Sequence, residues 1–500
     1  MSIDFTNPST LITLLAALGA AAVGVIGAGM LLRRPALLAY PFLLLMFTVP
    51  ESTLAVADAG VPIWSRGSGQ LLFPFVQWGV LGGLFWSIVS NRFQGRPMAI
   101  APVAVWLLGF AAMLLGHLVV GVWLGEEVRH ILGPMGFVNL VWMAIFVLLL
   151  VNAFRTERDV LRLMDFIIVV AAARAVYGLV RFAAFGGDPS NVYQNMEKLA
   201  LKITFFDISD SMLMTIGAVL ALLRAIGPPT PERTAFRRAL NLGVVLLCAA
   251  TIALTFRRTL QGGFVLAMLV VMVGLPRRQQ VIGVLLGLPA LLGAVAIAAG
   301  QRLAQVRAAD DAGLLVWIYD ILPDPYGPDN PRIMELRLAW QSFIESPILG
   351  IGSWGQYEGA NMIFWQTGER AGDFLHSGLL HLGLKAGIVG LVLFAIVAVV
   401  YVRSARREPG VAPSALDPLR IAGLAGMAFV IPDMVIGTPL IQVRTTLMWG
   451  LCLALPTISR VMDPQPGRFE ALPAPSTRPV RRPVRVDEPE TMAGAAAGSR

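Results

Sequence analysis

Apolar segments long enough to cross a membrane recur along most of this chain, and no other feature limits its fold as strongly. A helix needs about 17–25 mostly apolar residues to cross a hydrocarbon core. The 500 residues are 56% hydrophobic and only 14% charged, and their mean hydropathy is +0.71. This composition excludes a soluble globular protein and predicts an all-α polytopic membrane protein.

Hydropathy predicts about 12–13 transmembrane helices. Four parts follow: N-terminal transmembrane helices (1–299), a large, partly helical outer loop (300–374), C-terminal transmembrane helices (375–460) and a disordered cytoplasmic tail (461–500). The tail is rich in Pro, Ala and Arg and has no apolar period. We place the spans at residues 10–32, 36–56, 71–90, 98–122, 134–153, 163–185, 209–226, 241–256, 259–275, 281–299, 384–402, 420–436 and 441–459.

Six basic turns fall on one side of the predicted bundle, which is cytoplasmic by the positive-inside rule. The opposite, outer side holds the segment 186–208 and the large loop 300–374. Because the formal net charge of +8 arises in short turns, it does not indicate nucleic-acid binding. The basic turns begin at Arg33, Arg92, Arg155, Arg233, Arg277 and Arg403.

The two cysteines and the N-terminus bear on disulfides, zinc sites and a signal peptide. Cys248 and Cys452 lie inside predicted spans, so they suggest neither a disulfide framework nor a zinc site. The N-terminal residues carry no basic side chain ahead of the first apolar run. This favours an uncleaved first span over a cleaved signal peptide.

One outer turn departs from the charge rule. Arg257 and Arg258 lie between two apolar runs on the side that is otherwise poor in basic residues. They either reach the phosphates of lipid headgroups or form an anion site that faces the large loop. We favour the anion site, because a guanidinium group binds phosphate through two hydrogen bonds and stays charged at any pH.

The large outer loop is too long to be a plain connection. Residues 331–346 begin with a proline, which suits the first turn of a helix, and predict an amphipathic helix. Its apolar residues at helical spacing are Ile333, Leu336, Trp340 and Phe343.

Other groups of this loop have two interpretations each. The aromatic residues either pack the loop and anchor it at the membrane interface or stack on sugar rings. Arg332 and Arg337 are either surface charges or ligand-binding groups.

The stretch from His376 to Gly390 carries the strongest candidate for proton chemistry. Read as one helix, it places His376, Gly383, Gly387 and Gly390 on one face. Glycines on such a face let a membrane helix pack closely against a neighbour. The histidine then stands at the outer end, where a side chain that titrates near pH 7 can act as a base.

Three nearby groups stay open to more than one interpretation. His376 is either this base or a histidine that caps the helix or lies at the membrane interface. Asp373 either orients His376 or caps the helix N-terminus, and we favour the cap. His381 lies on another part of the helix wheel and is expected to be a packing or pore-side residue.

Three short motifs follow one another in the second half of the chain. The first is the turn formed by Arg257, Arg258 and Thr259. The second is an Arg, three residues, Leu pattern that leads into PILGIG at Pro347–Gly352. The third is His-Ser, nine residues, Gly, two residues, Gly. The motif residues are Arg258, Arg332, Leu336, His376, Ser377, Gly387 and Gly390.

In this order the motifs resemble those of the O-antigen ligase and polymerase superfamily, which are bacterial membrane glycosyltransferases. The family has a Ser-Arg-Gly-like turn, an Arg motif before Pro-Leu-Leu-Gly-x-Gly in the large outer loop, and a His motif after it. Arg258 is the better match to the turn arginine, and Arg257 stands where the family usually has Ser. Lys202 stands where the family often has Arg.

The resemblance implies a multi-pass enzyme of the bacterial inner membrane with its active site facing the periplasm. It would move a glycan from a polyprenyl-diphosphate carrier to an acceptor sugar hydroxyl, with inversion at the anomeric carbon. His376 would be the general base, and Arg258, Arg332 and Arg257 would bind the diphosphate. Supporting roles would go to Lys202, Arg337 and Asp373.

No acid cluster presents itself as a metal site, so we expect a reaction without metal or cofactor. The expected partners are the lipid-linked donor, an acceptor glycan, lipid A core or protein, and the bilayer. Polymerase and ligase both remain open, and a polymerase or exopolysaccharide-type transferase is favoured. The alternative is an anion or solute transporter, for which Arg174, Asp165 and Pro432–Asp433 are candidate mid-membrane groups.

Overall fold

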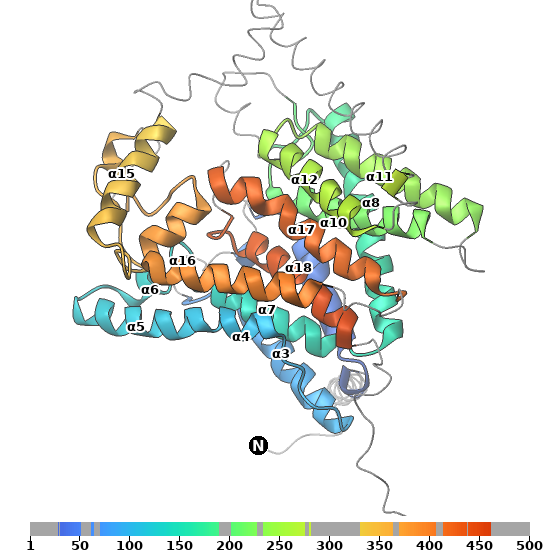
Figure 1. The fold of residues 1–500 in the computed structure, drawn as a ribbon, viewed down its shortest axis with the longest axis horizontal. Helices are drawn as coiled ribbons and strands as arrows, with labels where there is room; N and C mark the ends of the chain where they lie inside the picture. Colours follow the sequence, from blue (N-terminus) through green and yellow to red (C-terminus); the bar gives the residue numbers. More distant parts are fainter. Residues whose placement is uncertain are drawn as a thin grey trace, which may run out of the picture. The chain divides into compact units, whose positions relative to one another are not determined.

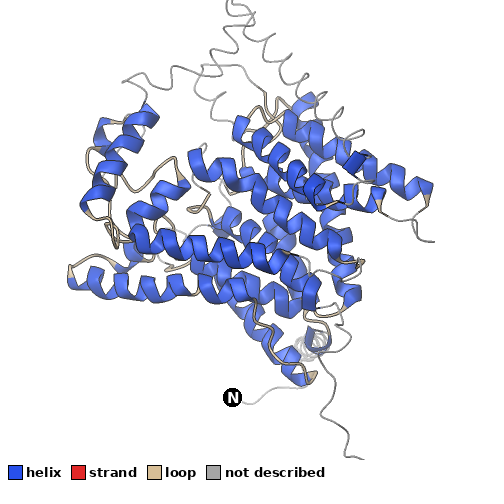
Figure 2. Cartoon of the chain, viewed as in Figure 1, coloured by secondary structure: helices blue, strands red, loops and turns tan. Residues whose placement is uncertain are grey.

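The computed structural model describes a set of ranges that covers most of the predicted spans. Within them every regular element is a helix (Figure 2). The large loop from 300 to 330 and the C-terminal tail from 462 lie outside the described residues. The described residues are 29, 31–51, 62–64, 71–189, 202–227, 234–275, 280–281, 331–363, 370–406, 414–437 and 439–461.

Figure 1 labels most of the α-helices along the chain. Short 3-10 helices lie at Pro62–Trp64 and Ala360–Met362. The α-helices are α2 (Ala36–Thr48), α3 (Phe75–Phe93), α4 (Pro102–Leu107), α5 (Gly109–Trp123), α6 (Val128–Ile131), α7 (Val138–Ala153), α8 (Glu157–Ala184), α10 (Ile208–Ile226), α11 (Ala235–Ala253), α12 (Arg258–Gly274), α15 (Pro331–Glu345), α16 (Gly378–Ala405), α17 (Asp417–Ile436) and α18 (Val443–Val461).

Six of the described segments are long and apolar enough to cross a membrane: Pro102–Trp123, α8, α10, α11, α16 and α17. Shorter apolar helices are α2, α7 and Thr259–Gly274 of α12. The prediction of an all-α, multi-pass membrane protein is therefore confirmed. The predicted spans at 10–32 and 281–299 fall almost wholly outside the described residues, so the total of about 12–13 remains a prediction.

Local sequence explains where several helices begin. The side chains of Thr156, Asp207, Thr234 and Ser377 accept a backbone N–H at the starts of α8, α10, α11 and α16. Such caps satisfy donors that the first helical turn leaves without a partner.

Prolines and glycines explain where predicted spans and helices differ. The span expected at 36–56 ends at Thr48, two residues before Pro50, because a proline disfavours helical backbone in the residue that precedes it. Pro41, by contrast, lies inside α2. The span expected at 384–402 starts earlier, at Gly378, because its first turns form a half-helix that ends at a kink.

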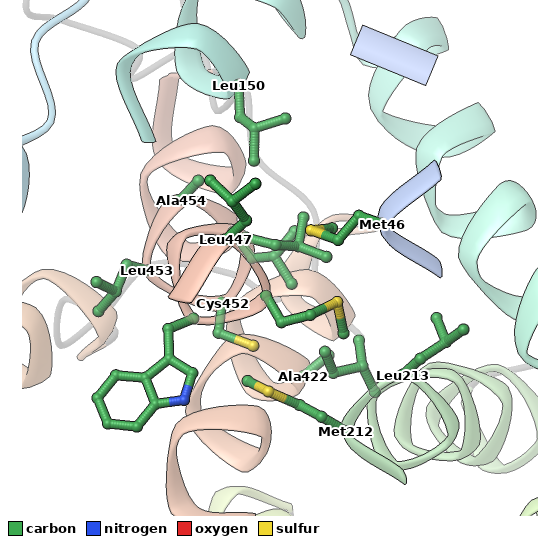
Figure 3. Close-up of a cluster of buried hydrophobic side chains, with 14 of the residues drawn as sticks. Met46, Leu150, Met212, Leu213, Ala422, Leu447, Cys452, Leu453 and Ala454 are labelled. Carbon is green, nitrogen blue, oxygen red and sulfur yellow. The ribbon is translucent and has the colours of Figure 1, made fainter. Parts of the chain in front are cut away.

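The core lies among α2, α7, α10, α17 and α18, and α10 is almost completely enclosed by its neighbours. Figure 3 shows Met46 of α2, Met212 of α10, Ala422 of α17 and Cys452 of α18 within one buried cluster. Glycines permit the closest approaches between helices. A Cβ on Gly263 of α12 would lie 2.1 Å from the carbonyl oxygen of Phe429 in α17.

Helix α15 confirms the predicted helix in the large loop, but the predicted apolar face is only partly correct. Trp340 is 52% exposed, whereas Glu335 and Ala339 are fully buried. Phe343 is buried in a second hydrophobic cluster with Tyr357, beside the start of α16. The buried face therefore includes a carboxylate that apolar periodicity does not reveal.

Candidate active site

Helix α16 is broken at Gly387, where the PILGIG loop packs against it. Gly387 has φ +63° and ψ −167°, which no α-helix contains. A Cβ at this position would lie 2.1 Å from the carbonyl oxygen of Ile348. Gly350 has φ +75°, and its Cβ would lie 2.5 Å from the carbonyl oxygen of Leu384. Both glycines are therefore required for the two backbones to meet.

The loop also supplies the hydrogen bonds that the break removes from α16. The N–H of Ile388 donates to the carbonyl of Pro347 at 2.8 Å instead of bonding within its own helix. The carbonyl of Leu384 accepts from the N–H of Ile351, also at 2.8 Å. Broken helices are stable in membrane proteins where such groups find new partners. The second and third sequence motifs thus form one structural unit.

The expected single face of His376 and the three glycines is wrong. His376 precedes α16, which begins at Gly378, and the break at Gly387 ends the helical phase. The glycines have different neighbours: Gly383 lies near Phe343 of α15 and Leu391, and Gly390 lies against Ala386 of its own helix. Gly387 meets the backbone of a loop rather than a neighbouring helix.

His376 forms a pair with Glu335 of α15. Its Nδ1 lies 2.8 Å from Oε2 of Glu335, whose side chain is fully buried, while the histidine side chain is 23% exposed. A carboxylate only accepts hydrogen bonds, so Nδ1 is the donor of this pair, and in the neutral imidazole the basic lone pair is then on Nε2. The edge of Phe374 packs against the ring at 4.5 Å between centroids. The histidine is thus oriented and still reachable.

Arg332 stands on the helix that holds this carboxylate. It precedes Glu335 by three residues on α15, and residues at this spacing lie on the same side of a helix. Arg332 and Arg337 are both exposed. Arg337 follows Arg332 by five positions, which places it about 140° away around the helix at about 100° per residue. Only Arg332 shares the side of α15 that faces His376.

Arg257 occupies the N-cap position of α12 and is held by groups from two other segments. It donates to the carbonyl of Phe206 and lies over the ring of that residue at 4.8 Å. It also lies 4.0 Å from Asp433 of α17. Asp433 in turn interacts electrostatically with both Arg257 and His376. The outer turn and the histidine therefore lie close enough to one carboxylate for their charges to act on it.

The other two basic candidates are less defined. Arg258 is the first residue of α12, and its side chain lies outside the described part of the structure. Lys202 is exposed and immediately precedes the buried Ile203.

Asp373 does not cap α16, contrary to the favoured interpretation. The cap is Ser377, whose side chain accepts from the N–H of Leu380 at 3.3 Å. Asp373 pairs instead with Arg370 at 2.5 Å and with the buried Lys385 at 3.3 Å. These ion pairs tie the end of the large loop to α16. His381 is buried, in agreement with a packing role.

A buried charge network adjoins the site and was not predicted. Arg444 of α18 is fully buried and binds Asp207 at 2.6 Å and Asp210 at 2.9 Å. Arg174 of α8 binds the same Asp210 at 2.7 Å. The charge of Asp207 also acts on Asp433, which lies 4.0 Å from Arg257. The sign of this network in the sequence is Arg444 itself, a charged residue near the start of the predicted span 441–459.

The described part of the chain has no group of three or more His, Cys, Asp or Glu side chains that could hold a metal ion. Reaction without metal remains a prediction that requires an experiment.

Comparison with known proteins agrees with the motifs. Residues 243–395 match a family model described as O-antigen ligase. The matched range includes Arg257, Arg258, Arg332, Glu335 and His376. A comparison with curated proteins found no match. Residues 243–395 therefore match the O-antigen ligase family, which supports the resemblance to the O-antigen ligase and polymerase superfamily that the motifs indicate.

Proposed function

We propose that this protein moves a glycan from a polyprenyl-diphosphate carrier to an acceptor sugar hydroxyl at the outer face of the membrane. The observation that carries the proposal is the His376–Glu335 pair, which lies within the O-antigen ligase family domain. Arg332 stands one helical turn from Glu335 on α15. The broken helix α16 fixes the position of His376. The type of reaction, ligase or polymerase glycosyltransfer, follows from the family.

The pair has the arrangement that a general base requires. The acceptor hydroxyl gives its proton to Nε2 of His376 as its oxygen attacks the anomeric carbon of the donor. Glu335 holds the Nδ1 proton and stabilises the imidazolium ion that forms. A histidine has an ordinary pKa of about 6.5, which suits this proton transfer near neutral pH.

The departing diphosphate requires positive charge. As the bond between the anomeric carbon and the phosphate oxygen breaks, negative charge grows on the lipid diphosphate. Arg332 and Arg258 would stabilise this charge, and it is in such interactions that electrostatic catalysis is largest. We assign Arg257 mainly to holding the turn, because Asp433 and Phe206 already engage its guanidinium group.

The loop inserted at Gly387 keeps the base rigid. A catalytic group must be held by well-fixed neighbours to within a fraction of an ångström. The backbone bonds of Ile388 and Ile351 fix the half-helix that follows His376, and Lys385 fixes the segment that precedes it. The role that we assign to this arrangement is to keep Nε2 of His376 directed at the acceptor.

The charged residues that suggested the transporter alternative all have partners of opposite charge. Arg174 is paired with Asp210, and Asp433 lies beside Arg257. Asp165 pairs with Arg224. These charges are thus engaged in ion pairs between helices.

An assay with the reconstituted protein distinguishes glycan transfer from solute transport, and a polymerase from a ligase. Purified protein in proteoliposomes is supplied with a polyprenyl-diphosphate-linked oligosaccharide and with acceptors of two kinds, the same lipid-linked glycan or a lipid A core. Formation of a longer lipid-linked glycan indicates a polymerase, and glycan on lipid A core indicates a ligase. Flux of solute without any glycan product would contradict the proposal.

A further inference from the structure

A cavity of about 310 Å³ lies among helix ends that the proposed reaction does not use. Its size is at the lower end of the range of about 300–1,000 Å³ that small-ligand pockets occupy. Asp159 is the acidic residue in its lining. Six arginines also line it: Arg33, Arg34, Arg96, Arg155, Arg158 and Arg162.

The cavity lies at the far end of the bundle from His376. Helix α7 has 16 residues and is therefore about 24 Å long. Asn139 at its start donates to the carbonyl of Leu440, just before α18 and its buried Arg444. Arg155 follows its other end. The cavity is therefore separate from the candidate active site.

Hydrogen bonds between distant segments build the walls of the cavity. Asn152 donates to the carbonyl of Ala99 and accepts from its N–H, both at 2.9 Å. Gln94 donates to the carbonyl of Leu32 at 2.8 Å. The segments that carry the arginines are thus held in place around one space. Basic residues on an ordinary exposed turn have no such fixed arrangement.

The charges in the cavity are not balanced by its own acid. Asp159 accepts from Thr156 at 2.6 Å and lies 4.0 Å from Arg162. Arg155 reaches the carbonyl of Pro97 at 3.5 Å, and its buried Nη1 has no hydrogen-bond partner among the described residues. Burial and the nearby charge of Arg96 both lower the pKa of Arg155. Like charges held together in this way are stabilised by a bound anion.

We infer that this cavity binds a phosphate-type anion, supplied either by the headgroup of an anionic phospholipid or by free phosphate. Guanidinium groups bind phosphate oxygens through paired hydrogen bonds, and several of them converge here from separate segments. By the positive-inside rule this end of the bundle meets the cytoplasmic leaflet, whose anionic lipids attract basic groups.

The test uses the full-length protein in nanodiscs of phosphatidylcholine. In one arm phosphatidylglycerol is titrated into the bilayer, and in the other inorganic phosphate is added to the buffer. Bound lipid is measured by native mass spectrometry, and both arms are followed by the thermal unfolding midpoint. Binding of phosphatidylglycerol alone identifies a lipid headgroup, and binding in both arms shows that free phosphate suffices.

Two variants and a control link the binding to the cavity. R96Q/R155Q removes two partly buried charges and is expected to weaken binding about 30-fold, from the contribution of two arginines near a membrane surface. R34Q/R158Q removes two exposed charges of the lining and tests the same point if the first variant fails to fold. R92Q changes an exposed arginine of the same helix end that does not line the cavity. The inference is overturned if neither probe binds or if R92Q weakens binding as much as the cavity variants do.

Discussion

The buried carboxylate of Glu335 lies 2.8 Å from Nδ1 of His376, although 41 residues separate them in the chain. One residue belongs to the helix of the large loop and the other precedes a broken membrane helix. Their pairing orients the histidine, and Nε2 is the ring nitrogen that does not face Glu335. Proton transfer at this nitrogen is the central step of the proposed reaction.

Replacing Glu335 by Gln should reduce kcat by about 100-fold or more, since an amide can hold the imidazole in the wrong tautomer and does not stabilise its cation. KM for the donor should change little, because Glu335 does not contact the diphosphate in the proposed mechanism. Glu345→Gln on the exposed end of the same helix is the control. Initial rates over a range of donor concentrations separate kcat from KM. Equal kcat for E335Q and E345Q would rule out the orienting role.

Replacing Gly387 by Ala should destabilise the protein by at least about 2 kcal/mol, because a side chain at positive φ is strained and its Cβ would meet the loop backbone. Activity should fall with the thermal unfolding midpoint. Gly116→Ala in α5 is the matched control, since a Cβ there has nothing within 4 Å. The unfolding midpoints of both variants provide the comparison. Similar midpoints would show that the break does not depend on glycine.

Helices with a regular spacing of apolar residues could be predicted from the sequence. Contacts between segments that are distant in the sequence could not. The span of α10 and the helix at Pro331–Glu345 follow from apolar periodicity, and the Arg257–Arg258 turn lies where expected. Glu335 was missed because one carboxylate on a helix gives no periodic signal. The break at Gly387 depends on a loop that arrives from 40 residues earlier, so a helical wheel cannot show it. The Arg444 network likewise needs partners from three other segments.

Replacing Arg332 by Gln should lower kcat/KM with a lipid-diphosphate donor by about 100-fold to 1,000-fold, the usual effect of losing one group that stabilises developing negative charge. Arg337→Gln should have a much smaller effect, because Arg337 points to another side of α15. Both arginines are exposed and on the same helix, so their variants should fold equally well. Glycan transfer assays on the two variants measure the difference. A larger loss in R337Q would place the diphosphate on the other side of the helix.

Removal of divalent cations should leave the reaction rate unchanged if arginines alone bind the diphosphate. The assay is glycan transfer by the reconstituted protein before and after treatment with EDTA. Re-addition of Mg²⁺ or Mn²⁺ controls for effects of the chelator on the membrane. Loss of activity that is restored by either ion would show that a metal takes part.

The most direct test of the account is the glycan transfer rate of His376→Gln, measured in a single turnover with saturating lipid-linked donor and acceptor. His130→Gln is the control, because His130 is also partly exposed and is not part of any of the three motifs. We predict that H376Q loses at least about 100-fold in rate while it still binds the donor, and that H130Q keeps the wild-type rate. Transfer by H376Q at the wild-type rate would contradict the proposal that His376 is the base.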